Sequence, residues 1–420
     1  MTVSRRICAG YSLGSLVTGS FSTVPGLLLL PYLTDSLAVP AATAGLLVLL
    51  PKAWDVIFNP VAGRISDRRG PRRPLLLQGG VALAVLFAAL FALPAGGGVY
   101  VGVVFLLCAT AYAFFQVPYV AMMAEITTDY DQRTRLMTWR MAILAVAILL
   151  SGAGAPAIRD ATGGYHVMGI VVGLLILIGT VTVYVGTRGV ATSGHMDTGA
   201  GFSELFAAVR QSREFRRLLV VFVIQAAGVS TLLAGVDYMS RVVLRDSGMQ
   251  TLLFAAFVGP ALLVMPMWQR VGTRYGKRAG FIVSSIIFAV PLAFCTLAQV
   301  VPAVVVVVLA AFTGVGYSGM QVFPMAMLPD VITAEEQRSG ARRAGLFSGV
   351  WTAGETLGFA VGPGIYGIIL AAGGYVSSTD AAVAQPQSAV TAALIGFAVV
   401  PVALVLVALP LLTKKLEVRV

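Results

Sequence analysis

Cysteine and histidine are scarce in this chain of 420 residues, which has three cysteines and two histidines. Cys8, Cys108 and Cys295 stand singly in apolar segments, so the sequence suggests neither a disulfide framework nor a metal site with paired ligands. His166 and His195 stand at a loop or a helix end, with no third ligand nearby. We therefore expect ordinary solvated histidines and no bound metal.

Charged residues are also few, at 11% of the chain, whereas 58% is hydrophobic. The mean hydropathy of +0.89 is too high for a soluble protein of this size and indicates an integral membrane protein. A phosphate-binding loop of the form G-x-x-x-x-G-K-S/T is missing, and no motif groups a nucleophile, a base and an orienting acid. We expect no enzyme activity and no cofactor, with an ion gradient rather than ATP as the energy source.

Apolar stretches of about 20 residues, bounded by charge or by glycine and proline, predict an all-α membrane protein. We count twelve transmembrane helices in two halves of six helices each. The expected spans are 8–33, 41–64, 74–94, 99–126, 137–157, 166–187, 217–240, 250–272, 279–299, 302–328, 343–371 and 389–412.

Basic residues are distributed unevenly between the predicted loops. One set of alternate loops and both ends of the chain hold 24 of the 29 Lys and Arg residues, and the opposite loops hold three. By the positive-inside rule both termini are cytosolic. The net charge of +11 then faces anionic lipid headgroups, so it requires no nucleic-acid partner. High Ala, Val, Gly and Arg with little Lys suggests a bacterium, and hence its cytoplasmic membrane.

A segment repeats within the chain. Residues 116–134 and 321–339 share seven identities in 19 aligned positions at an offset of 205. This repeat predicts two pseudo-symmetric bundles, 1–187 and 217–420, joined by a cytosolic linker, 188–216, that is partly amphipathic. Parallel repeats of this kind are common in secondary transporters, whose substrate site lies near the membrane midplane between the repeats.

The loop after the second span fits the pattern G-x-x-x-D-R-x-G-x-R-R from Gly63 to Arg73. It resembles the signature loop of the major facilitator superfamily, and this resemblance implies that superfamily's fold and a conformational gate at the cytosolic side. The alternative is a tight loop that is rich in arginine because of topology alone. The second copy has Thr273 in place of the acid, so we expect an asymmetric gate. The gate residues would be Gly63, Asp67, Arg68, Gly70, Arg72 and Arg73.

Three further segments are similar to the glycoside-pentoside-hexuronide cation symporters. They are Lys52 to Gly63, Pro118 to Arg140, and Asp330 to Trp351. The resemblance implies a cation site built from acids on spans 2 and 4. This chain departs from that pattern with Asn59 and Gln116, and it has Glu355 where a lysine is usual.

Four ionisable residues stand out inside the predicted spans, namely Lys52, Asp55, Arg140 and Glu355. A charge in the membrane is costly unless it is paired or faces water, which makes each one a candidate for a functional site. We interpret Asp55, with Lys52 and Asn59 on the same helical face, as the site of a coupling ion, either H+ or Na+. The alternative is a structural Lys52–Asp55 ion pair.

Candidate contacts to a small-molecule substrate lie in both halves. Gln116 and Gln321 are equivalent in the repeat, and Glu355 and Arg140 offer charge. Tyr119 and Trp351 could stack on a sugar ring or an acyl chain. The alternatives are helix-to-helix hydrogen bonds for the glutamines, lipid phosphate for Arg140, and ordinary packing for the aromatic rings.

Together these features predict a monomeric, cation-coupled symporter of a sugar-like or amphipathic solute that works by alternating access. Two alternatives stay open at this stage. One is a proton-driven exporter of amphiphiles or drugs, and the other is a lysolipid transporter or a passive lipid scramblase.

Overall fold

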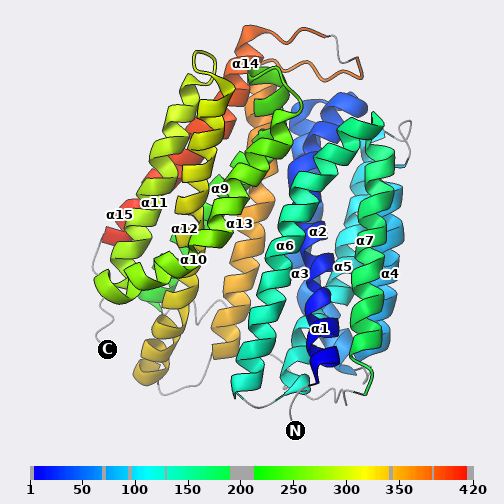
Figure 1. Ribbon diagram of the computed structural model, residues 1–420, viewed down its shortest axis with the longest axis vertical. Coiled ribbons are helices and arrows are strands. Elements are labelled where there is room, and N and C mark those ends of the chain that lie inside the picture. Colours follow the sequence, from blue (N-terminus) through cyan, green and yellow to red (C-terminus); the bar gives the residue numbers. More distant parts are fainter. Residues whose placement is uncertain are drawn as a thin grey trace. The chain divides into compact units, whose positions relative to one another are not determined.

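Figure 1 shows the computed structural model, which describes residues 4–68, 72–92, 97–127, 130–189, 212–339, 344–380 and 383–413. Every regular element in these ranges is helical. Twelve of the helical segments are long and apolar enough to cross a membrane, which confirms the predicted twelve-helix fold. The tenth, Ala303–Glu335, runs past the predicted end at residue 328, because a polar turn continues the helix beyond the apolar stretch.

The chain divides into two compact units, which are described separately. Unit 1 comprises residues 1–198 and 377–383, and unit 2 comprises residues 199–376 and 384–420. Most of the predicted linker, 190–211, lies outside the described residues. The predicted amphipathic character of this linker therefore stays a prediction.

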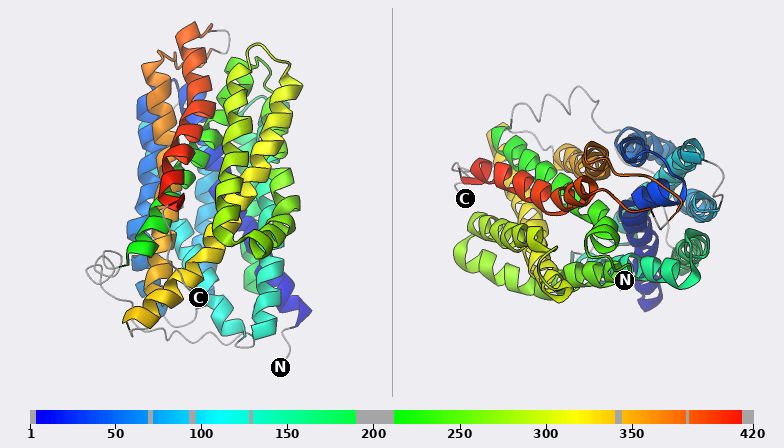
Figure 2. Two further views of the ribbon diagram at one scale, coloured as in Figure 1. Left: turned by 90° about the vertical axis from the view of Figure 1, so that its left-hand side faces the viewer. Right: turned by 90° about the horizontal axis from the view of Figure 1, so that it is seen from above.

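Unit 1 contains six spans, which run alongside one another in Figure 1 and are seen from their ends in the right-hand view of Figure 2. The first span is made of two helices and a π-helical turn. The elements are α1 (Arg5–Leu13), α2 (Ser15–Pro31), η1 (Tyr32–Ser36), α3 (Ala41–Arg68), α4 (Arg72–Leu90), α5 (Gly97–Ile126), α6 (Tyr130–Thr162) and α7 (Tyr165–Gly186).

Unit 2 repeats this plan, and its first span again ends in a π-helical turn. The elements are α9 (Arg213–Tyr238), η2 (Met239–Val243), α10 (Met249–Tyr275), α11 (Lys277–Phe294), η3 (Cys295–Leu297), α12 (Ala303–Ser339), α13 (Ala344–Ala372), α14 (Gln387–Leu394), η4 (Ile395–Val399) and α15 (Val400–Thr413).

The two units share one packing pattern. In unit 1 the fourth span, α5, packs against α3 and α4, and α2 packs against α6. In unit 2 the fourth span, α12, packs against α10 and α11, and α9 packs against α13. Corresponding spans thus make corresponding contacts, as expected for a duplicated bundle.

Two glycines let α12 approach both of its neighbours. A Cβ atom on Gly314 would lie 1.9 Å from the carbonyl oxygen of Phe257 on α10, and one on Gly316 would lie 2.2 Å from the backbone nitrogen of Phe288 on α11. These contacts are with backbone atoms, which cannot move aside without shifting a helix. Small residues at such positions are a common means of close helix packing in membranes.

We predict that Gly316→Ala destabilises the protein by about 1 to 3 kcal/mol, because the added methyl group overpacks the contact between α12 and α11. The measurement is the apparent melting temperature of the purified protein in detergent. Gly259→Ala on α10 is the matched control, because a Cβ atom there has no neighbour within 4 Å. Equal melting temperatures for the two variants would contradict the packing argument.

Candidate functional site

Asp55 is a buried acid on α3, with 9% of its surface exposed. Its Oδ1 atom is buried and has no hydrogen-bond partner among the described residues. Lys52, one turn earlier, interacts electrostatically with Asp55, but its Nζ donates instead to the carbonyl oxygen of Ser22 on α2, at 3.4 Å. The carboxylate is therefore only partly compensated, which favours a functional role over a purely structural ion pair.

Polar side chains from α2 and α5 lie near this carboxylate. Thr18 Oγ1 donates to Gln116 Oε1 at 2.8 Å. Tyr112, one turn before Gln116 on α5, is within electrostatic range of Asp55. Asp55, Thr18, Tyr112 and Gln116 are called the Asp55 group below. Asn59 lies one turn further along α3 and is half-buried.

Unit 2 contains a related arrangement. Tyr317 stands one turn before Gln321 on α12 and is within electrostatic range of Glu355 on α13. At the offset of 205, Tyr317 and Gln321 correspond to Tyr112 and Gln116. Each unit therefore carries the same tyrosine and glutamine pair near one acid, but the acid comes from the second span in unit 1 and from the fifth span in unit 2.

From the sequence, Tyr317 is predicted only as an aromatic ring near the polar residues, and Tyr112 and Thr18 were missed. The repeat offset contained the signal for the tyrosines, because it aligns Tyr112 with Tyr317 just before the segment that was compared. Thr18 carries no comparable signal in the sequence. Only the packing of α2 against the rest of unit 1 brings its hydroxyl group to Gln116.

Tyr119 and Arg140 belong to a second polar cluster in unit 1. Tyr119 is fully buried; its hydroxyl group donates to the carbonyl oxygen of Tyr11 at 2.8 Å, and that of Tyr11 donates back to the Tyr119 carbonyl at 3.1 Å. Ser15 bridges the Tyr119 hydroxyl at 3.2 Å and the Arg140 carbonyl at 3.1 Å. These bonds hold α1 and α2 against α5 and α6.

The guanidinium group of Arg140 lies over the Tyr119 ring, 5.0 Å from its centroid. Arg140 is only 7% exposed, and its Nε atom has no hydrogen-bond partner among the described residues. Burial inside unit 1 disfavours the alternative in which Arg140 extends to lipid phosphate. It leaves an unused donor for an anionic or hydroxyl group.

Trp351 is 2% exposed and stacks on Phe222 with ring centroids 4.4 Å apart. This contact joins α13 to α9 and accords with the packing alternative for the ring. The indole Nε1 atom, however, is buried without a partner in the described part of the chain. Trp54 is different, since its Nε1 donates to Thr110 Oγ1 at 3.2 Å and thereby joins α3 to α5.

The structure describes only some of the six predicted gate residues. Gly63 lies in α3, the side chains of Asp67 and Arg68 lie outside the described part of the structure, and so does Gly70. Arg72 is 2% exposed. The role of these residues as a gate stays a prediction.

Arg73 has a counterpart in the second unit. It donates to the carbonyl oxygen of Tyr184 near the end of α7 and lies over the ring of that tyrosine, 4.8 Å from its centroid. At the repeat offset, Arg278 donates to the carbonyl oxygen of Leu412 near the end of α15, at 2.6 Å. In both units this arginine thus stabilises the end of the sixth span.

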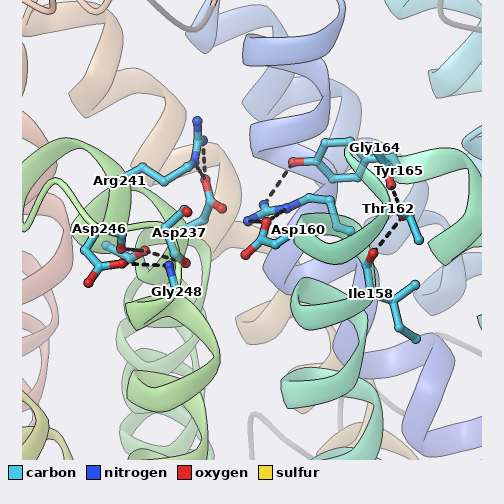
Figure 3. A network of polar contacts seen from close by, with 12 residues as sticks. Ile158, Asp160, Thr162, Gly164, Tyr165, Asp237, Arg241, Asp246 and Gly248 are labelled. Carbon is cyan, nitrogen blue, oxygen red and sulfur yellow. Dashed lines mark hydrogen bonds and ion pairs between the residues drawn. The ribbon is translucent and has the colours of Figure 1, made fainter.

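A further buried acid escaped the sequence analysis, which counted four ionisable residues inside the spans. Asp237 in α9 is fully buried and forms an ion pair with Arg241 one turn later (Figure 3). The Asp and Arg spacing of i, i+4 was a usable signal, and Asp237 lies inside the expected span, 217–240. In unit 1, Arg159 similarly pairs with Asp160 at 2.7 Å, near the end of α6.

The predicted site residues therefore form separate clusters within their own units. Lys52, Asp55 and Gln116 belong to one region of unit 1, while Tyr119 and Arg140 form a second cluster linked to it through Tyr112. Gln321 and Glu355 share a region of unit 2. Among the described residues, no three His, Cys, Asp or Glu side chains are grouped as a metal site.

Comparisons with known proteins cover nearly the whole chain. The sequence model of the MFS/sugar transport protein family matches residues 10–414. An uncharacterized symporter of Bacillus subtilis (strain 168) is 25% identical, over 95% of this chain and 89% of its own. A glucuronide carrier protein homolog of Escherichia coli (strain K12) is 23% identical, over 90% of this chain and 85% of its own. The solved structure of the nucleoside transporter NupG has the same fold, with a TM-score of 0.72, 12% identity, and coverage of 99% of this chain and 100% of its own.

We predict that Tyr119→Phe lowers the free energy of unfolding by about 1 to 3 kcal/mol, because it removes the buried hydrogen bonds of the Tyr119 hydroxyl group with the Tyr11 carbonyl oxygen and with Ser15. The measurement is again the apparent melting temperature in detergent. Tyr275→Phe is the control, because Tyr275 is 64% exposed. If both variants melt at the temperature of the parent protein, the hydroxyl contacts of Tyr119 do not hold α1 in place.

Proposed function

Because the chain belongs to the MFS/sugar transport protein family, we propose that it is a cation-coupled symporter that imports a small solute by alternating access. Its resemblance to the glycoside-pentoside-hexuronide cation symporters is confirmed by the family match and by the names of its relatives. The chain is a multi-pass membrane protein and a secondary transporter of the major facilitator superfamily. We propose the coupling to a cation, the import direction and the class of substrate.

The buried carboxylate of Asp55 is the single observation that carries this proposal. A charged group at this depth in a span costs several kcal/mol unless it is paired or faces water. Asp55 nevertheless has an unpartnered oxygen atom, and its neighbouring ammonium group bonds to a carbonyl oxygen instead. A cation that binds next to a buried carboxylate stabilises its charged form. If this stabilisation differs between two conformations, ion binding shifts the equilibrium between them, which is the basis of coupling.

The substrate is proposed to be a sugar-like or amphipathic solute. The relative named as a glucuronide carrier protein homolog supports a sugar derivative. We assign Gln116, Gln321, Arg140 and Glu355 to its polar groups, because amide, guanidinium and carboxylate groups bind hydroxyl groups well. Tyr119 and Trp351 are buried among other aromatic rings. They support the shape of the site, and Trp351 Nε1 remains a candidate donor.

The proposed location is the cytoplasmic membrane of a bacterium, with both termini in the cytosol. The asymmetry of 24 basic residues against three supports this orientation. The symporters reported above are bacterial proteins. We propose a monomer that works among membrane lipids without a nucleic-acid partner.

We predict that Asp55→Asn abolishes accumulation driven by an ion gradient while it spares solute exchange, because the amide cannot bind and release a cation. The measurement is uptake into proteoliposomes that carry imposed proton or sodium gradients, with a panel of sugars, sugar acids and lysolipids as solutes. Asp246→Asn is the matched control, because Asp246 is exposed and its Oδ1 accepts a hydrogen bond from the backbone N–H of Gly248 in the same loop.

Unchanged accumulation by Asp55→Asn would remove Asp55 from the coupling mechanism. The parent protein decides between the wider alternatives in the same assay. Accumulation driven by inward ion flow supports a symporter, depletion from loaded vesicles indicates an exporter, and equilibration that ignores both ions indicates a passive scramblase.

A further inference from the structure

Helices α2 and α5 both pack against α3, and oxygen atoms on each of them are engaged by hydrogen donors. On α5, Gln116 Oε1 accepts the hydroxyl hydrogen of Thr18.

The nearest charged group occupies another oxygen atom. Lys52 Nζ donates to the carbonyl oxygen of Ser22 at 3.4 Å. A hard metal cation is bound by several oxygen ligands at once, with carboxylates supplying the negative charge. No three His, Cys, Asp or Glu side chains are grouped among the described residues, so Asp55 is the carboxylate that would have to supply this charge.

Electrostatics also disfavour a metal ion here. Lys52 and Asp55 stand one helical turn apart and interact. A sodium ion at Asp55 would place a second positive charge next to this ammonium group, and the repulsion is strong in a medium of low dielectric constant. A proton neutralises the carboxylate, needs one oxygen atom and leaves the Lys52–Ser22 bond intact. The buried Oδ1 atom of Asp55 is such an oxygen.

The other charged and titratable groups near Asp55 come from several elements. Tyr112 on α5 is in electrostatic range, and Arg140 on α6 and Tyr119 on α5 interact in turn with Tyr112. Helix α2 contributes the hydroxyl group of Thr18 and the carbonyl of Ser22. Two elements that contact α3 also carry charges, Asp35 in η1 and Arg72 and Arg73 at the start of α4.

From this arrangement we infer that the coupling ion is a proton carried by the Asp55 carboxyl group, and that the Asp55 group does not bind sodium. The inference rests on the proposed cation coupling and names its ion. In one state the carboxyl group takes up a proton at Oδ1, and in the other state the same O–H bond breaks and the proton returns to water. Lys52 keeps its carbonyl partner in both states.

The first experiment measures sodium binding to the parent protein directly. Purified protein in detergent is dialysed to equilibrium against radioactive sodium at alkaline pH, where protons compete least, with choline chloride keeping the ionic strength constant. We expect no saturable binding. Saturable binding that is lost in Asp55→Asn would overturn the inference and leave the proposed symport intact, with sodium as its ion.

The second experiment detects the proton itself. Infrared difference spectra are recorded between acidic and alkaline buffer on protein reconstituted in lipid, without sodium and without solute. We expect the parent spectrum to contain a carbonyl-stretch component of a protonated carboxyl group that is lost in Asp55→Asn and retained in Asp246→Asn, the matched acid-to-amide change at an exposed position. An Asp55→Asn spectrum with the same carboxyl components as the parent spectrum would overturn the assignment to Asp55.

Neither experiment requires a known substrate, so the identity of the ion is tested separately from the proposed transport. If Asp55→Asn does not yield folded protein, the dialysis still decides, because saturable sodium binding to the parent protein that is released by added protons overturns the inference without any variant. Failure of every solute to enter proteoliposomes would count against the proposed function alone.

Discussion

The cost of placing charged and polar groups inside a membrane constrains most of this structure. Backbone N–H and C=O groups avoid this cost by hydrogen-bonding to each other in helices throughout the described spans. Most buried side chains meet it with nearby partners, as in the ion pair of Asp237 and Arg241 and in the reciprocal bonds of Tyr11 and Tyr119. One oxygen atom of the Asp55 carboxylate has no partner among the described residues, as is also true of Arg140 Nε and Trp351 Nε1. Of these three groups, the carboxylate is the one that a cation can neutralise.

The duplicated architecture carries both symmetric and asymmetric features. Tyr112 with Gln116 and Tyr317 with Gln321 are equivalent, and so are Arg73 and Arg278, each of which contacts the end of a sixth span. The acids are not equivalent, since Asp55 lies on a second span and Glu355 on a fifth span. Duplication therefore accounts for the helices and their hydrogen-bonding side chains. The acids are proposed to perform different tasks, with ion coupling for Asp55 in unit 1 and substrate contact for Glu355 in unit 2.

The sequence was sufficient to predict the fold, because apolar length, glycine and proline boundaries and the repeat all act along the chain. It was also sufficient to single out Asp55, since an acid in an apolar span is visible without a structure. Thr18 was beyond reach, because its role depends on how α2 packs in unit 1. Asp237 was within reach of the sequence but was not named, although it lies in the predicted span and Arg241 follows it at a spacing of i, i+4. The burial of Arg140 under the Tyr119 ring likewise arises from tertiary contacts that no local pattern encodes.

The central claim is that solute entry and ion entry occur together through Asp55. The most direct test is the pH of a weakly buffered suspension of bacterial cells that express the protein, recorded as each candidate solute is added. The account predicts that the right solute makes the medium alkaline, because protons enter with it, and that cells with Asp55→Asn show no such change. Entry of that solute into cells of the parent protein with neither proton nor sodium movement would contradict the account.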